Sequence, residues 1–462
     1  MAVVGAGLAG LGAASRLARH GCQVCVLERS QCAGGRFSGH SVAGFNIERS
    51  LPLLHGTEPG LLDWLRELEV AAEILPLRRL RLAQLHKGSV RRLGGSSSGS
   101  ALRTPGLGWR DLLRTLRLPR LLRRYAPLLD PQRPERAARW DDRSLADFGR
   151  LYFGQRGLER WIGPAAAAAT PADLHQLSRV AFLLRCTTGQ WPDGALGPLP
   201  LALARRPMYE VVQRLASRLE IRFGAEVEGV DRSRSGELVL RLRERDDAVA
   251  AAGGSEAMEI DAVILATAAG ESARIASSIL TTPEREFLGR VRYLPTVTLS
   301  LALEAPIAAS PLFVRVPEVD GLPFTSWLFD DGDDSGRAPP GAGLVTLTAT
   351  RRFALAHRSS TPEVVEKELL TRFESAMPAV GPALRFSRLE RVEAAVPNFA
   401  VGAYRALARF HRVQADRCGL GRRLYFAGDH LVGPGAQDAL WSGLRAAGDL
   451  LADFERSGRS AP

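Results

Sequence analysis

The stretch that decides the fold is VVGAGLAG at residues 3–10, which is followed after a short interval by VCVLE at residues 24–28. Both segments contain short apolar runs that are typical of parallel strands. Between them, residues 8–19 are rich in Ala and Leu and contain no proline, so they favour a helix. This order predicts a dinucleotide site, because the unpaired amides at the start of such a helix attract phosphate.

The three glycines of the turn have separate tasks. Gly5 allows a tight turn, Gly7 lets a phosphate approach the backbone, and Gly10 lets the helix pack closely against the strand. Glu28 ends the second strand, close to the roughly 20 positions after the turn at which an acidic side chain meets the ribose hydroxyls. The alternative is a purely structural turn in a chain with 46 glycines. The complete order of strand, turn, helix, strand and acid favours the dinucleotide site.

A cationic element follows the second strand. Residues 34–36, GGR, place Arg36 after two permissive glycines. The guanidinium fork of this arginine could hold a pyrophosphate from a second side. This extra element predicts FAD, rather than NAD, as the cofactor.

Another glycine-rich stretch lies near the other end of the chain, with LYFAGDH at residues 424–430 and GAQDALWSGLRAA at residues 435–447. Together with residues 5–36 it resembles the two signatures of the FAD-dependent amine oxidase, phytoene desaturase and protoporphyrinogen oxidase superfamily. The chain looks most similar to the protoporphyrinogen oxidase-like members. Two motifs in the right order, separated by nearly the whole chain, are far more specific than either alone. The resemblance implies a flavin-containing oxidoreductase.

The motifs and the resemblance together give a set of expected FAD contacts. The resemblance implies that Val227 pairs its backbone with the adenine and that Asp429 contacts the ribityl or phosphate part. It also implies that a helix beginning near Ala436 points its positive end at the flavin ring. The full set of expected contacts is Gly5, Ala6, Gly7, Leu8, Ala9, Gly10, Glu28, Arg29, Gly35, Arg36, Val227, Gly428, Asp429, Ala436 and Ala439.

Three positions near the flavin carry alternatives. The family commonly has glycine where Asp438 stands, so this carboxylate either alters the approach to the flavin or caps the helix. It also often has glycine where Ser50 stands. His430 is a candidate base or substrate contact, with a structural histidine as the alternative. No metal-ligand spacing and no nucleophilic triad is recognisable in the sequence, so no metal site is expected.

Composition excludes several classes of protein. Hydrophobic residues make up 45% and charged residues 24%, as in globular proteins. The net charge is +11, yet only two of the 61 basic residues are lysine and arginine is spread along the whole chain. Without a nucleic-acid reader motif, no nucleic-acid binding is expected. Attraction to an anionic membrane or an acidic substrate stays open. The sequence carries no signal for the oligomeric state or the electron acceptor.

Cysteine usage and hydropathy bear on location. Five cysteines are few and odd in number, which argues against a disulfide framework, and Cys22 and Cys25 read as small buried hydrophobes. No apolar run is long enough to span a bilayer. A cytoplasmic protein is expected, with peripheral contact to the inner membrane face left open.

The predicted fold class is α/β, with a Rossmann-like FAD-binding domain interleaved with a substrate domain of mixed sheet and helices. At 462 residues the chain is too long for one ordinary hydrophobic core, so two domains are expected. The predicted FAD-binding domain takes residues 1–52, 205–285 and 413–456, and the predicted substrate domain takes residues 53–204 and 286–412. A sheet in the second part, with strands at 296–303 and 344–350, is expected to roof the flavin. The expected loops are a flexible one at 94–100, a low-complexity hairpin tip at 246–257 and an exposed acidic one at 330–343.

Residues 109–117 predict an amphipathic helix. Its Trp and Leu residues fall on one face and Arg110, Arg114 and Arg117 on the other. The favoured interpretation is a surface helix that packs on its own core. The alternatives are a membrane-surface patch and a substrate entrance that receives an anionic amphiphile.

The expected activity is removal of hydride by FAD from a largely apolar substrate of the tetrapyrrole or polyene type. Many amine oxidases use a flavin-facing lysine, whereas residues 296–303 contain none, and the two lysines, Lys87 and Lys367, lie in an apparent turn and surface helix. The alternatives are an amine oxidase and a non-catalytic flavin-binding protein. The partner expected in each case is a small hydrophobic or amphiphilic molecule.

Overall fold

A computed structural model describes most of the chain. The described residues are 1–51, 53–55, 59–69, 78–93, 104–187, 201–234, 236–244, 256–308, 310–332, 336–418, 421 and 423–456. The loop predicted at 94–100 and all but the last two residues of the hairpin tip predicted at 246–257 lie outside these residues.

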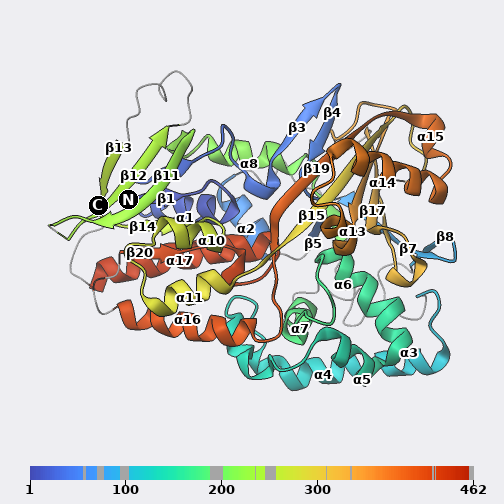
Figure 1. The fold of residues 1–462 in the computed structure, drawn as a ribbon, viewed down its shortest axis with the longest axis horizontal. Coiled ribbons are helices and arrows are strands. Elements are labelled where there is room, and N and C mark those ends of the chain that lie inside the picture. Colours follow the sequence, from blue (N-terminus) through green and yellow to red (C-terminus); the bar gives the residue numbers. More distant parts are fainter. Residues whose placement is uncertain are drawn as a thin grey trace.

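A five-stranded parallel sheet carries the glycine turn (Figure 1). Its order is β10-β2-β1-β14-β20, and every neighbouring pair is parallel. The strands are β1 (Ala2–Val4), β2 (Cys25–Glu28), β10 (Ile221–Phe223), β14 (Val263–Leu265) and β20 (Leu424–Phe426). Strands from the start, middle and end of the chain thus lie side by side. The sheet confirms the predicted Rossmann-like α/β fold.

Helices cover both faces of this sheet, because alternate residues of each strand are apolar on both sides. Val3, Val26 and Ile264 pack against one group of helices, whereas Val4 and Leu265 belong to the core on the other face. The first group is α1 (Leu8–Arg19), α2 (Pro59–Glu67), α8 (Met208–Ala216) and α17 (Ala436–Arg456). The second is α10 (Ala269–Ile275), α11 (Thr282–Arg290) and α16 (Ala403–Cys418).

The helices α1 and α17 approach each other backbone to backbone. A Cβ added at Gly443 of α17 would lie 1.9 Å from the carbonyl oxygen of Ala9. Any larger residue at this position would push the two signature helices apart. The two motifs at the ends of the sequence are therefore directly packed together.

A smaller antiparallel sheet stands beside the parallel one. It consists of β11 (Ala225–Arg232), β12 (Leu238–Glu244) and β13 (Glu256–Ile260), in that order. Its buried residues Val227, Val230 and Leu240 join the core on the α10 side of the parallel sheet.

A seven-stranded mixed sheet forms the other half of the molecule (Figure 1). Its order is β19-β15-β18-β17-β16-β7-β8, and among these neighbours only β16 and β7 are parallel. The strands are β7 (Arg81–His86), β8 (Ser89–Arg92), β15 (Tyr293–Leu303), β16 (Leu312–Arg315), β17 (Phe324–Asp331), β18 (Gly343–Ala349) and β19 (Leu384–Pro397). Two helices, α13 (Arg351–Ala356) and α14 (Pro362–Ala376), pack on one face, while α6 (Gly163–Ala169) contacts β16 and β17.

A block of helices lies beneath this sheet in Figure 1. Its members are α3 (Trp109–Thr115), α4 (Arg117–Tyr125), α5 (Leu145–Gly157), α6 and α7 (Arg179–Thr187). Ser144 caps α5, because its hydroxyl accepts a hydrogen bond from the Asp147 amide at 3.1 Å. The sequence also suggests helix from residue 174, but α7 begins only at Arg179. Residues 174–178 instead form a turn and bridges to Ser144 and Ala400.

Shorter elements complete the fold. They are β3 (Gly39–Val42), β4 (Phe45–Glu48), β5 (Leu53–His55), β6 (Arg78–Arg79), β9 (Leu201–Leu203) and α15 (Val380–Ala383). Short 3-10 helices lie at η1 (Gly35–Phe37), η4 (Ala126–Leu128), η5 (Pro134–Trp140), η7 (Glu318–Asp320) and η8 (Asp429–Leu431), and a short π-helix lies at η6 (Leu158–Ile162). No helix in the described part of the chain is long and apolar enough to cross a membrane. The domain boundaries given above stay a prediction.

The expectation of an exposed acidic loop at 330–343 is wrong at Asp330 and Arg337, which are buried, while residues 333–335 lie outside the described residues. Arg337 is 2% exposed, and its Nε donates a hydrogen bond to Glu48 at 2.7 Å. Two further guanidinium nitrogens donate to the carbonyl oxygens of Ala204 and Arg206 at 3.0 and 3.1 Å. Burial raises the pKa of the Glu48 carboxyl, while Arg337 counteracts that effect. The loop is drawn inward because a buried carboxylate requires a partner.

The expectation for residues 109–117 is also wrong. Trp109, Leu113 and Leu116 are 67%, 57% and 65% exposed, although they were expected to pack on a core. The chain forms two short helices here, and α4 supplies the buried apolar face with Leu118 and Leu121. The apolar face of α3 is therefore left on the surface.

Candidate active site

The glycine turn has the geometry that a phosphate site requires. Gly5 has φ of +103°, and a Cβ there would lie 2.8 Å from the carbonyl oxygen of Ala266. A Cβ at Gly10 would lie 1.8 Å from the carbonyl oxygen of Gly5, whereas a Cβ at Gly7 would meet no atom within 4 Å. Gly7 therefore faces open space at the start of α1. No side chain caps this helix start, so its amides remain available to an anion.

Glu28 is held in place by the backbone on both sides. The Ala6 amide donates a hydrogen bond to Oε2 at 2.7 Å, and the Ser30 amide donates to Oε1 at 2.9 Å. These bonds fix the carboxylate beside the glycine turn. Glu28 and its neighbour Arg29 both line the same cleft as Gly7.

Arg36 and Asp429 join the two signatures. The Arg36 Nη2 lies 2.7 Å from Oδ2 of Asp429, and Nη1 donates a hydrogen bond to the carbonyl oxygen of Ala395 at 2.8 Å. Burial raises the pKa of the Asp429 carboxyl, while the Arg36 guanidinium opposes that rise. Both residues line the cleft. The ion pair therefore places a cation in the same cleft as the glycine turn.

His430 lies behind the cleft, not in it. Its ring is 3% exposed, and its Nδ1 is 3.3 Å from the Tyr293 hydroxyl. Burial lowers the pKa of His430 to about 3, so the ring is neutral at neutral pH. The Ala269 amide donates to the Tyr293 oxygen at 3.1 Å, so the hydroxyl can donate its own proton to Nδ1. Tyr293 itself lines the cleft, and burial raises its pKa.

Asp438 caps the start of α17. Its Oδ2 accepts a hydrogen bond from the Gly435 amide at 2.8 Å and also forms an ion pair with Arg185. Of the two alternatives for this carboxylate, the cap is present in the structure. Ser50 donates a hydrogen bond to the carbonyl oxygen of Arg36 at 2.9 Å.

The cleft has two neighbouring compartments. The first has a volume of about 300 Å³ and is lined by Gly7, Glu28, Val227 and Tyr293, among other residues. The second, of about 220 Å³, lies between the Ala-rich helix α6 and the mixed sheet. Arg36, Phe37, Arg49 and Ala395 line both compartments. The second compartment is called the substrate pocket below.

Most of the predicted cofactor residues meet in this cleft. Those lining the first compartment are Gly5, Gly7, Leu8, Ala9, Glu28, Arg29, Gly35, Arg36, Val227, Gly428, Asp429 and Ala439. Ala436 lines the substrate pocket instead. Ala6 and Gly10 lie in the turn just behind the lining, where Ala6 binds Glu28 and Gly10 contacts Gly5.

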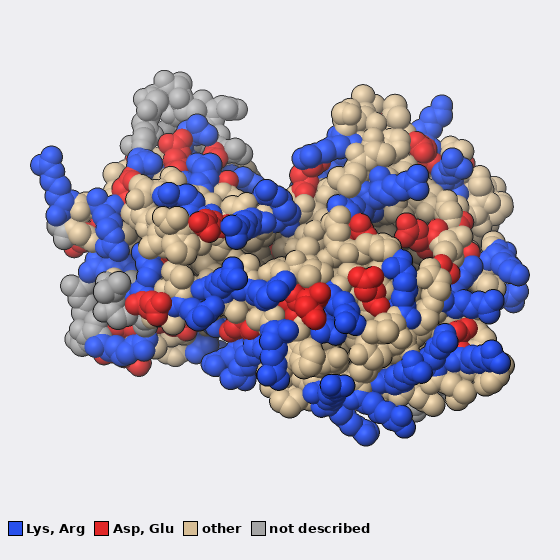
Figure 2. Space-filling model, turned by 60° about the horizontal axis from the view of Figure 1, so that its bottom comes forward, with Lys and Arg blue, Asp and Glu red and all other residues tan. Residues whose placement is uncertain are grey.

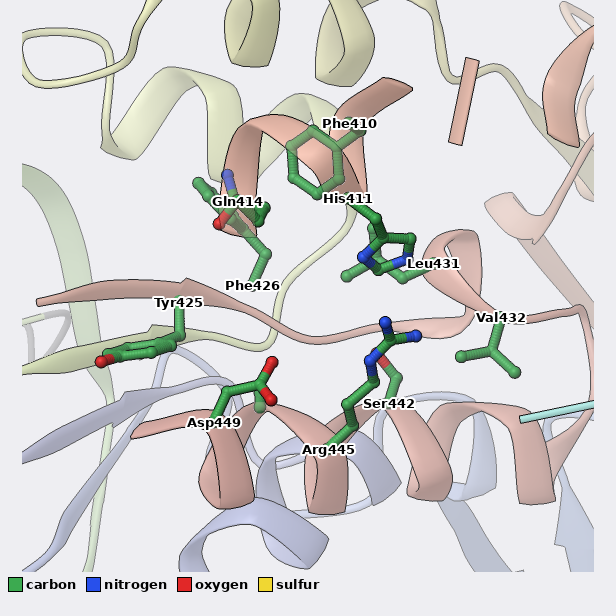
Figure 3. Close-up of a pocket in the computed structure, with 11 residues that line it drawn as sticks. Phe410, His411, Gln414, Tyr425, Phe426, Leu431, Val432, Ser442, Arg445 and Asp449 are labelled. Atoms are coloured by element: carbon green, nitrogen blue, oxygen red, sulfur yellow. The ribbon is translucent and has the colours of Figure 1, made fainter. Parts of the chain in front are cut away.

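A third, much smaller cavity lies between α16, β20 and α17 (Figure 3). It has a volume of about 30 Å³ and shares no lining residue with the two compartments above. His411, Gln414, Arg445 and Asp449 surround it. Its size and polar lining suit one buried water molecule. The cavity therefore belongs to the packing of the helices on the sheet.

Comparison with known proteins agrees with this geometry. The family model described as flavin containing amine oxidoreductase matches residues 8–451. The chain belongs to this family. It is an FAD-dependent oxidoreductase. The predicted family and FAD as the cofactor are confirmed.

Solved structures share the whole fold at low identity. A putative protoporphyrinogen oxidase from Exiguobacterium sp. 255-15 is 17% identical, with a TM-score of 0.72 and 98% of each chain covered. Putrescine oxidase bound to putrescine is 18% identical, with a TM-score of 0.73 and 98% of each chain covered. Cyclohexylamine oxidase from Brevibacterium oxydans IH-35A is 15% identical, with a TM-score of 0.73 and coverage of 98% and 99%. A search of curated proteins finds no match.

The residues of the first compartment fit FAD. The empty space over Gly7 leaves room for a pyrophosphate where any side chain would intrude. The uncapped start of α1 offers amides to its charge, and Arg36 offers a guanidinium. Glu28 presents a carboxylate within the same compartment.

Sequence reasoning missed three residues of the cleft. Tyr293 lines the first compartment, and Arg185 and Arg315 line the substrate pocket. Arginine is spread along the whole chain, so neither arginine stood out by type or by a neighbouring motif. Only the strand register and the packing of α7 bring them to the site.

Proposed function

We propose that the enzyme removes hydride from the carbon framework of a largely apolar substrate of the tetrapyrrole or polyene type. Protoporphyrinogen oxidase-like activity is the nearest named chemistry. Bound FAD supplies the hydride acceptor. The chain binds and orients the substrate between α6 and the mixed sheet and keeps water away from the reacting carbon. Alanines 165 and 167–169, with Phe313 and Val396, supply apolar walls for such a substrate.

The observation that carries this proposal is the position of the lysines. The whole sequence has only Lys87 and Lys367. Both are exposed, one beside the β7–β8 turn and the other on α14, and neither lines the cleft. On β15 the pocket wall is formed by Thr296 and Thr298. The flavin-facing lysine that many amine oxidases use has no counterpart here, which supports dehydrogenation of a carbon framework over amine oxidation.

The roles of individual cofactor residues are part of the proposal. The start of α1 with Gly7 would bind the pyrophosphate, and Glu28 would bind the ribose hydroxyls. Val227 would pair with the adenine through its backbone, and Asp429 would contact the ribityl or phosphate part. The positive end of α17, capped by Asp438, would face the flavin ring. His430, neutral and buried, would hold Tyr293 and take no proton from substrate.

An anaerobic flavin-reduction screen tests the proposed function. The purified holoenzyme is mixed with porphyrinogens, carotenoid precursors, and primary amines or polyamines, and loss of flavin absorbance is followed. Rapid reduction by a porphyrinogen or a polyene precursor is expected. Rapid reduction by an amine alone would establish the amine oxidase alternative instead. A chain that binds FAD but is reduced by none of these classes would be the non-catalytic flavin-binding protein.

We also propose that this protein is cytoplasmic and contacts an anionic membrane surface through α3 and α4. The exposed side chains of Trp109, Leu113 and Leu116 are surrounded by exposed arginines. These are Arg110, Arg114, Arg117, Arg120, Arg123 and Arg124. Figure 2 shows Lys and Arg gathered along the lower edge of the face that contains the helical block. Apolar side chains among guanidinium groups suit the boundary between lipid headgroups and acyl chains.

A further inference from the structure

A row of polar side chains crosses the mixed sheet on the face toward the substrate pocket. The strand register pairs Thr298 with Thr348, Thr348 with Ser326, Ser326 with Arg315 and Arg315 with Gln84. Residues paired across neighbouring strands point to the same face of a sheet. These five residues are called the polar row below.

The row faces the pocket because the opposite face of the same strands is an apolar core. Val314, Trp327 and Leu347, each next in sequence to a member of the row, belong to the core under α13 and α14. Thr298, Arg315 and Thr348 line the substrate pocket.

Two hydroxyls of the polar row have no hydrogen-bond partner among the described residues. They are Oγ of Ser326, which is 0% exposed, and Oγ1 of Thr348. Leaving buried polar atoms unpaired costs free energy, so such atoms point to a ligand that completes them. Thr348 lines the substrate pocket, whereas Ser326 does not and lies between Thr348 and Arg315 in the polar row.

The charges around the pocket have one sign. Arg36, Arg49, Arg185 and Arg315 line it, and no Asp, Glu or Lys does among the described residues. Three of these arginines have a carboxylate partner outside the pocket: Arg36 pairs with Asp429, Arg185 with Asp438, and Arg49 with Glu390 at 3.7 Å. Arg315 is only 7% exposed, so water screens its charge weakly. This field attracts an anion and repels an ammonium group.

We propose that the substrate carries a carboxylate, and that Arg315 and Thr348 of the polar row bind it. The guanidinium provides a fork that matches the two carboxylate oxygens, and the Thr348 hydroxyl can donate a further hydrogen bond. The alanines of α6 then hold the apolar body of the same molecule. The proposal rests on the substrate pocket of the proposed function and narrows its substrate to an apolar carboxylic acid.

The position differs from the one that the sequence suggested for an anionic group. The arginines of residues 109–117 were one candidate for receiving a carboxylate. No residue of α3 or α4 lines either compartment of the cleft. The anionic group is therefore assigned to the sheet and not to the surface helices.

Three probes of equal chain length test the proposal: decanoate, decanol and decylamine. Each is titrated into the holoenzyme under air-free conditions, and binding is read from the flavin absorbance change and from calorimetry. Decanoate is expected to bind more tightly than decanol, and decylamine to bind least. Decylamine binding as tight as decanoate would overturn the proposal.

Variants locate the binding group. Arg315→Gln should weaken decanoate binding roughly ten- to a hundredfold, as expected for hydrogen bonds to a charged group, and leave decanol binding unchanged. Thr348→Val should weaken decanoate binding by a smaller factor. Arg388→Gln, an exposed arginine on β19 of the same sheet, is the matched control. FAD content and melting temperature show that each variant is folded.

The outcomes separate this proposal from the proposed function. Unchanged decanoate affinity in folded Arg315→Gln would overturn the carboxylate site, whatever reduces the flavin. The enzyme could also bind decanoate selectively through Arg315 while only amines reduce its flavin. That result would keep the carboxylate site and reject hydride removal from a carbon framework. Arg315→Lys adds a further readout, because a single ammonium keeps the charge and should retain only part of the affinity.

Discussion

Glu28 shows how one residue can be prepared for its ligand before the ligand binds. Both carboxylate oxygens already accept backbone amides, from Ala6 and Ser30. An ionised carboxylate can accept further hydrogen bonds through its remaining lone pairs. Since its position is fixed, little side-chain entropy remains to be lost when ribose hydroxyls bind.

Replacing Glu28 by Ala should weaken FAD binding roughly ten- to a hundredfold, because hydrogen bonds to a charged acceptor are worth about 1.5 to 3 kcal/mol. The measurement is the FAD dissociation constant of apoprotein that is reconstituted with FAD. Glu67→Ala, which removes a carboxylate from an exposed pair with Arg19, is the control and should bind FAD normally. An unchanged constant in the Glu28 variant would mean that the residue does not hold the ribose.

Sequence predicts the glycine turn and Glu28 well because their geometry is local. Gly5 and Glu28 are recognised from spacing within one strand-helix-strand unit. Arg315 and Ser326 escape prediction because they become neighbours only through the register of β16 and β17. A shift of one strand by one residue in that register would put the two side chains on opposite faces of the sheet. No local pattern encodes that choice.

At the scale of elements, Glu284 joins α11 to α16. It caps the start of α11 by accepting a hydrogen bond from the Thr281 amide at 2.9 Å. From α16, Arg417 Nη1 donates to both carboxylate oxygens at 2.6 Å, and Gln414 donates to Oε1. Burial raises the pKa of Glu284, but these hydrogen bonds and the Arg417 charge outweigh it and lower the pKa overall.

Glu284→Gln should destabilise the protein by roughly 3 kcal/mol at pH 7, because it leaves Arg417 buried without its counter-charge. A carboxyl whose pKa is lowered on folding stabilises the protein above the unfolded pKa and loses that effect as pH falls through the folded value. The stability difference between wild type and variant should therefore shrink below about pH 4.3. Melting temperature against pH measures it. Glu286→Gln, an exposed residue of the same helix, is the control, and a pH-independent difference would contradict the argument.

The helices α3 and α4 show where prediction from periodicity fails. The pattern places Trp109, Leu113 and Leu116 on one face, which is correct for a helix, yet it cannot say what that face contacts. A new helix starts at Arg117 and directs its own leucines inward. The face of α3 is left unpaired on the surface, beside the arginines of α4.

Leu113→Ser with Leu116→Ser should reduce binding to vesicles that contain phosphatidylglycerol by roughly tenfold or more, at about 0.8 kcal/mol per methylene withdrawn from lipid. Stability should change little because both side chains are more than half exposed. Co-sedimentation at low and high salt is the measurement. Val364→Ser, which removes an exposed apolar residue from α14, serves as control. Equal binding of wild type to neutral and anionic vesicles would reject the membrane surface.

At the scale of the whole molecule, the first compartment is assembled from segments far apart in the sequence. Gly7 and Glu28 come from the start, Val227 from the small sheet, Tyr293 from the mixed sheet and Asp429 from the end. The two signature motifs predicted this assembly because both belong to one cofactor. The contribution of the mixed sheet was predicted only as a roof over the flavin, since the long connections between its strands carry no motif.

FAD should therefore stabilise the whole chain and not one segment. A ligand that binds only the folded state adds about 2.7 kcal/mol at a concentration 100 times its dissociation constant and about 4.1 kcal/mol at 1,000 times. Melting of the apoprotein should shift upward with FAD concentration in a single transition. Riboflavin, which lacks the pyrophosphate and adenosine, should stabilise far less, because it cannot reach the glycine turn or Glu28. The protein could instead melt in two separate transitions, of which FAD shifts only one, or riboflavin could shift the melting temperature as much as FAD does. Either result would show that the distant segments do not act together in holding the cofactor.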